Sequence, residues 1–132
     1  MILCDSGALV ALADRTDKHH EAVRAFASAD FLIPSTVLCE VDYFLTKYLG
    51  DEVAKSFLEE VTTNNELLVF DAIDLARVNQ IRRQYNDLPL GFVDASVIAL
   101  AERYRIQQIL TIDRRHFLAI KSLHFGHFEL LP

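Results

Sequence analysis

Apolar residues along the chain form short runs that alternate with longer amphipathic stretches. The short runs, "ILC" at 2–4, "FLIP" at 31–34, "LLVF" at 67–70 and "QQILTI" at 107–112, are typical of buried strands. In the longer stretches apolar positions recur every three or four residues, which predicts helices at about 6–13, 17–28, 35–48, 51–63, 73–85 and 90–101. A short helical turn at 114–120 and an edge strand in "HFELL" at 127–131 complete the predicted elements.

This alternation of strand and helix predicts the fold class. Parallel strands need helical crossovers, so we expect a three-layer α/β/α fold with a central, mainly parallel sheet. The 132 residues are 52% hydrophobic, enough to fill one core without disulfides or structural metal. We therefore expect residues 1–132 to form a single domain. Cys4 and Cys39 form no CxxC pair and are interpreted as packing residues.

Several local features of the helices can be predicted. Ser6 and Asp17 are the expected N-caps of the first two helices. The helix at 35–48 carries a predicted core-facing stripe made of Val37, Val41, Phe44, Leu45 and Tyr48. Its aromatic pair, Phe44 and Tyr48, fits packing in the core or in a dimer interface better than base stacking.

Four acidic residues occupy related positions in this pattern. Asp5 and Asp113 directly follow strands, whereas Glu40 and Asp94 lie in the first turns of helices. Ligands of parallel α/β sheets bind at the carboxyl ends of the strands, where the helices begin. Each acid alone is also explained as a helix cap or a partner of the helix dipole. Asp42, two residues beyond Glu40, points about 200° around the helix and is interpreted as solvated.

The apolar segment "LGFVDASVIALA" at 90–101 makes Asp94 the clearest of these acids, because a buried carboxylate needs a partner. Carboxylates gathered in one pocket repel one another unless cations keep them ionised. Hard oxygen ligands in an open cluster suit Mg²⁺ or Mn²⁺. The sequence therefore predicts a divalent metal site, without deciding between one and two ions.

Four segments give the chain a family resemblance. "LCDSGALVALAD", "STVLCEVDYFL", "LGFVDASVIALAE" and "ILTIDRRHF" resemble the acidic blocks of PIN-domain ribonucleases, most closely the VapC toxins of VapBC toxin–antitoxin pairs. The resemblance covers essentially the whole chain. It implies that the catalytic and metal-binding residues are Asp5, Glu40, Asp94 and Asp113, with Ser6 and Thr111 in supporting roles.

The same resemblance implies an activity and partners. Members of this family cleave single-stranded or loop RNA with Mg²⁺ or Mn²⁺, form homodimers and are inhibited by a cognate antitoxin. Arg114 and Arg115 directly follow Asp113, so we expect at least one of them to contact RNA phosphate. Arg82 and Arg83 are interpreted as an exposed helix face. The histidines show no convincing ligand spacing, and His124-x-x-His127 is interpreted as the entry to a strand.

Other function classes fit less well. A phosphatase of the haloacid dehalogenase type needs a second acid where this chain has Gly7, and the scattered glycines form no phosphate-binding loop. A non-catalytic PIN-like binding module, or an RNA-processing nuclease without an antitoxin, remains open. The net charge of −6 argues against a broad basic surface. The chain has no apolar run long enough to span a membrane and no signal-peptide pattern at its start, so we expect a cytoplasmic protein.

Overall fold

The computed structural model describes residues 1–64 and 66–132 and contains a five-stranded central sheet. Its strands are β1 (Ile2–Cys4), β2 (Phe31–Pro34), β3 (Glu66–Leu68), β4 (Gln108–Leu110) and β7 (Glu129–Leu131). They lie in the order β3-β2-β1-β4-β7, and every neighbouring pair is parallel. The predicted parallel α/β sheet is confirmed, as is the last strand at its edge.

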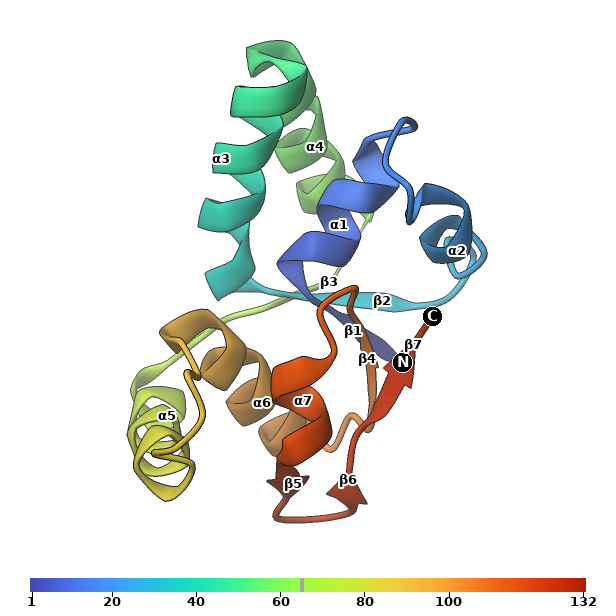
Figure 1. The fold of residues 1–132 in the computed structure, drawn as a ribbon. Helices are drawn as coiled ribbons and strands as arrows, with labels where there is room; N and C mark the ends of the chain where they lie inside the picture. The colour runs from blue at the N-terminus through green and yellow to red at the C-terminus, as the bar shows by residue number, and fades with distance from the viewer. Residues whose placement is uncertain (65) are drawn as a thin grey trace.

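Helices cover both faces of this sheet (Figure 1). One layer, above the sheet in Figure 1, contains α1 (Ser6–Ala13), α2 (His20–Arg24), α3 (Leu38–Leu49) and α4 (Asp51–Asn64). The layer below contains α5 (Ala72–Gln84), α6 (Phe92–Tyr104) and α7 (Arg115–Ala119). A 3₁₀ turn, η1 (Ser35–Val37), precedes α3, and a small antiparallel hairpin pairs β5 (Lys121–Ser122) with β6 (Gly126–His127).

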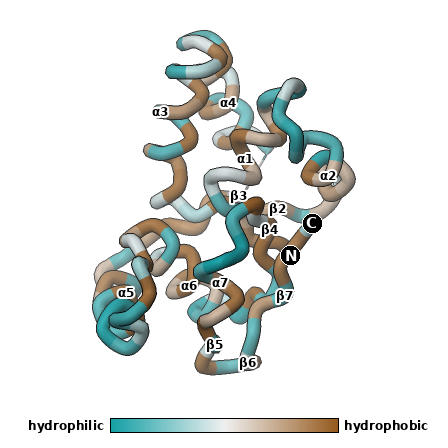
Figure 2. Tube along the Cα trace, viewed as in Figure 1, coloured by the Kyte–Doolittle hydropathy of each residue, from teal (hydrophilic) through white to brown (hydrophobic). Residues whose placement is uncertain are grey.

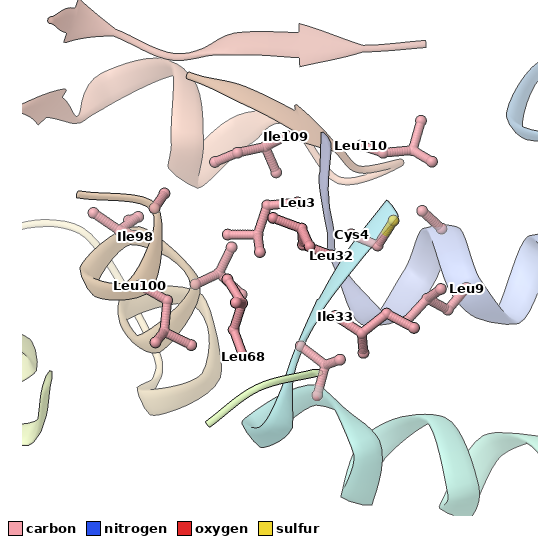
Figure 3. Packing of buried hydrophobic residues seen from close by; sticks show 14 of the residues in the cluster. Leu3, Cys4, Leu9, Leu32, Ile33, Leu68, Ile98, Leu100, Ile109 and Leu110 are labelled. Atoms are coloured by element: carbon pink, nitrogen blue, oxygen red, sulfur yellow. The ribbon is translucent and has the colours of Figure 1, made fainter. Parts of the chain in front are cut away.

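The core forms where the two helical layers meet the sheet. Leu3 and Ile109 lie at the centre of the close-up in Figure 3, with Leu9 of α1 on one side and Ile98 and Leu100 of α6 on the other. All of these side chains are almost fully buried. The strands form a hydrophobic centre in Figure 2, whereas the segment that joins β4 to α7 is hydrophilic. The apolar runs of the sequence therefore fill the interior, and polar residues gather where the strands end.

Some local predictions were wrong by a few residues. Asp5, rather than Ser6, is the N-cap of α1, because its carboxylate accepts a hydrogen bond from the Ser6 backbone N–H. Helix α2 begins only at His20, after the Asp17 side chain has closed a turn by accepting from His19 N. The side chain of Asp17 thus stabilises the turn that leads into the helix.

The predicted stripe on α3 is narrower than expected. Val37, Val41 and Leu45 are fully buried, but Phe44 is 37% exposed and Tyr48 is 63% exposed. Helix α3 packs mainly against α1 and α4, so a wider apolar face is not covered. Cys39 is exposed, contrary to prediction, because it lies two residues from the buried Val37 and Val41 and so points to the other side of the helix, whereas Cys4 is buried in the core as expected.

The strand order creates a switch point between β1 and β4. From β1 the chain crosses to β2 on one side, and β4 joins β1 on the other. Parallel α/β sheets bind their ligands at such a point, outside the carboxyl ends of the strands. Asp5 follows β1 there, and Thr111 and Asp113 follow β4.

Candidate functional site

Asp5 is the innermost acid of the candidate site and is only 6% exposed. One carboxylate oxygen accepts from Ser6 N at 2.8 Å, and the other accepts from the Thr111 hydroxyl at 2.9 Å. Burial raises the pKa of the Asp5 carboxyl to about 6, even though both hydrogen bonds favour its ionised form. The charges of Asp94 and Glu40 raise this pKa further, so the three carboxylates repel one another.

Glu40 reaches the site from the first turn of α3. Its Oε1 accepts a hydrogen bond of 2.8 Å from the Ser6 hydroxyl. Ser6 therefore contacts both acids, donating its backbone N–H to Asp5 and its side-chain hydroxyl to Glu40. This arrangement ties the start of α1 to the start of α3.

Asp94 lies in the first turn of α6, whose N-cap is Gly91. Its carboxylate does not cap the helix. Instead, Asp94 Oδ2 lies 2.7 Å from Nδ1 of His116, which is the second residue of α7. Both side chains are partly buried, at 28% and 19% exposure. His116 is the site neighbour that the sequence interpretation missed. The spacing of the histidines in the sequence gave no signal for it.

Asp113 is the most exposed of the four acids. The Arg115 guanidinium donates to both of its oxygens at 3.2 Å and lowers the pKa of this carboxyl. Arg114 instead donates at 3.4 Å to the carbonyl oxygens of Leu130 and Pro132, beside the last strand. Both arginines therefore flank the carboxyl end of β4.

The site brings these acids to one edge of the sheet but does not enclose an ion as the side chains stand. Among the side chains that the structure describes, no three from His, Cys, Asp or Glu are arranged closely enough to hold a metal. Each of the other three acids has a protein partner: Glu40 accepts from Ser6, Asp94 is bonded to His116, and Asp113 is paired with Arg115. Arg82 and Arg83 are exposed on α5, as predicted.

Comparison with known proteins places this geometry in a family. The model of the PIN domain matches residues 2–122. The chain belongs to the PIN-domain family. It is also 34% identical to ribonuclease VapC26 of Mycobacterium tuberculosis over 135 aligned residues, which cover 99% of this chain and 100% of VapC26. The resemblance noted from the four acidic blocks is thereby confirmed.

Solved structures share the fold over most of the chain. The crystal structure of VapC20 from Mycobacterium tuberculosis, described as a sarcin–ricin loop cleaving toxin, superposes with a TM-score of 0.85 at 19% identity and covers 100% of both chains. VapBC2 from Rickettsia felis, bound to a promoter DNA fragment, matches with a TM-score of 0.72 at 19% identity over 98% of this chain and 100% of that chain.

Among the residues that the structure describes, no helix combines the length and the apolar character needed to cross a bilayer.

Proposed function

We propose that this PIN-domain protein is an Mg²⁺- or Mn²⁺-dependent endoribonuclease that hydrolyses RNA phosphodiester bonds, and that it is the toxin of a type II toxin–antitoxin pair. The observation that carries the proposal is the buried Asp5 at the switch point, close enough to Glu40 and Asp94 for their charges to raise its pKa. The relationship to ribonuclease VapC26 over nearly the whole chain supports the same activity.

The donor chemistry of the site fits a hard divalent cation. Asp5, Glu40 and Asp94 offer only carboxylate oxygens, the ligands that Mg²⁺ and Mn²⁺ prefer. The repulsion that raises the pKa of Asp5 is the kind that a bound cation offsets. These three residues would hold the ion, and Asp113 would complete a second metal site or position the attacking water. When bound, the ion would lower the pKa of a water molecule and stabilise charge on the phosphoryl oxygens.

The side chains of this protein prepare the site for that chemistry. Thr111 and the Ser6 backbone fix both oxygens of Asp5, and the Ser6 hydroxyl orients Glu40. Such preorganisation lowers the cost of positioning reacting groups.

Arg114 and Arg115 lie at the rim, where a guanidinium can contact RNA phosphate. We expect Arg114→Ala or Arg115→Ala to weaken RNA binding and to reduce its salt dependence, and unchanged binding in both variants would place the RNA elsewhere.

The decisive test of the activity is RNA cleavage by the purified protein. We expect cleavage with Mg²⁺ or Mn²⁺ and none in EDTA. Asp94→Asn should lower turnover by orders of magnitude, whereas Asp42→Asn should change it little. Asp42 provides the control, because it lies on α3 two residues beyond Glu40 and therefore points about 200° around the helix from that acid. Full activity in EDTA, or equal losses in both variants, would contradict the proposal.

The toxin role is tested separately by expression in cells. We expect the protein alone to arrest growth and co-expression with a small protein encoded beside it to restore growth. Arrest without rescue would favour an RNA-processing nuclease that has no antitoxin.

We also propose a homodimer, for which the exposed aromatic residues Tyr43, Phe44 and Tyr48 of α3 offer apolar surface. Light scattering at micromolar concentration tests this assembly, and a monomer would exclude it.

A further inference from the structure

The contact between Asp94 and His116 is a hydrogen bond between two different elements of the site. Asp94 Oδ2 and His116 Nδ1 are 2.7 Å apart. An ionised carboxylate can only accept hydrogen bonds, so Nδ1 of His116 must carry the hydrogen and donate it. With 28% of the Asp94 side chain and 19% of the His116 side chain exposed, the bond is partly buried.

The position of His116 suggests a purpose for this bond beyond anchoring a helix. The chain leaves β4, passes Asp113 and enters the five-residue helix α7, where His116 reaches back to the first turn of α6. One oxygen of Asp94 is thereby engaged by His116, which restricts how the carboxylate can turn. In the described part of the chain, no hydrogen bond or ion pair engages the other oxygen, Oδ1.

We infer that His116 is a positioning residue that orients Asp94 so that Oδ1 is presented to the divalent cation. This inference rests on the proposed function, because it assigns a role in the same metal site. Groups that orient a metal ligand through a hydrogen bond typically contribute roughly 10- to 100-fold to metal affinity. The opposite possibility, that His116 competes with the metal for Asp94, predicts tighter binding when His116 is removed.

Calorimetric titration of the full-length protein with Mn²⁺ at neutral pH tests this role without RNA. We expect His116→Ala to raise the Kd for Mn²⁺ by roughly 10- to 100-fold. His116→Asn should restore affinity close to that of the wild type, because its amide nitrogen occupies nearly the place of Nδ1. His116→Gln, whose longer side chain puts the amide elsewhere, should not. His124→Ala is the matched control, since His124 is exposed.

The outcomes separate this inference from the function on which it depends. If His116→Ala binds Mn²⁺ as tightly as wild type or more tightly, while Asp94→Asn loses binding, the inference is wrong and the metal site stands. If wild type binds no Mn²⁺, both are wrong. If His116→Ala fails to fold, the comparison of His116→Asn with His116→Gln decides, and equal affinities would overturn the positioning role. A purely structural tie would lower the melting temperature in EDTA and leave the Kd unchanged.

Discussion

Asp5 serves two purposes that oppose each other at neutral pH. Its carboxylate caps α1 and accepts from Thr111, yet it is buried beside the charges of Glu40 and Asp94. Hydrogen bonds favour the ionised carboxylate, but the loss of water around it costs more, so its pKa rises to about 6. A folded protein without metal therefore tolerates an unfavourable charge at the centre of its site.

This raised pKa predicts how stability depends on pH. Because the pKa of Asp5 is higher in the folded protein than its ordinary value of 3.8, the folded state binds the proton more tightly. The resulting stabilisation is fully present below about pH 3.8 and is lost as pH rises through about 6. Asp5→Asn removes this dependence and keeps a good N-cap residue. In EDTA, we expect the stability of wild type relative to Asp5→Asn to fall by roughly 1–3 kcal/mol between about pH 4 and pH 7.5.

Urea unfolding of both proteins at the two pH values measures this change. The comparison uses the difference between the proteins, since the other titrating groups are common to both and largely cancel. A difference that stays constant with pH would mean that Asp5 is not a perturbed acid in the folded state.

The junction of α1 with the segment after β4 depends on a glycine. A Cβ added at Gly7 would lie 2.9 Å from Ile112 Cγ1 and 3.2 Å from Ile112 Cδ1. Helix propensity alone predicts that Gly7→Ala stabilises the protein by about 1 kcal/mol. Overpacking costs about 1–3 kcal/mol, so we expect a net loss of stability. In an Ile112→Ala background the same change should become stabilising, and denaturant unfolding of the four proteins checks this reversal. An identical effect in both backgrounds would exclude the clash.

Helices α5 and α6 are joined by a partly buried ion pair. The Arg77 guanidinium donates to both oxygens of Glu102, at 2.7 and 3.1 Å, and the Glu102 side chain is only 4% exposed. Among the described residues, Arg77→Met leaves this buried carboxylate with only the Leu123 N–H as a partner, which should cost about 3 kcal/mol. The exposed pair of Lys55 with Asp51 is the control, and Lys55→Met should cost far less stability than Arg77→Met, because water screens the exposed pair. Equal losses in urea unfolding would contradict this distinction.

Strands and helices could be predicted where the apolar residues followed a single pattern, either a short apolar run or a spacing of three to four residues. The strands at 2–4 and 31–34 and the helix at 73–85 lie within one residue of β1, β2 and α5. Where the burial of a side chain depends on which neighbouring elements cover it, the sequence alone could not predict the burial. The pattern sets the phase of α3 but not how many neighbours cover it, so Phe44 and Tyr48 were included in the core-facing stripe although they are exposed. The hairpin of β5 with β6 has strands of two residues, too short for any periodicity to reveal.

At the scale of the whole molecule, the location of the candidate site follows from topology, but its contacts do not. Any parallel sheet brings the carboxyl ends of its strands to one edge, so Asp5 and Asp113 could be placed there from the sequence. The order β3-β2-β1-β4-β7, which sets Thr111 against Asp5, had to come from the structure. The same is true of His116, because its bond to Asp94 joins elements that are distant in sequence.

Metal binding should appear as a change in the stability of the whole fold. A ligand that binds only the folded state stabilises it by RT ln(1 + [L]/Kd), about 2.7 kcal/mol at a hundredfold excess over Kd. In EDTA we expect Asp94→Asn to melt at the same temperature as wild type or higher, because the variant removes one repelling charge while the Asn oxygen can still accept from His116. In millimolar Mn²⁺ wild type should gain stability and the variant should gain less.

Thermal melts of the two proteins in both conditions measure this difference, and Asp42→Asn serves as the control for removing a charge from α3 outside the acid cluster. The control should gain as much from Mn²⁺ as wild type does, since Asp42 is not among the carboxylates whose charges act on Asp5. An equal metal-induced shift in wild type and Asp94→Asn would show that Asp94 is not a ligand. The bond from His116 would then serve only to hold α7 against α6.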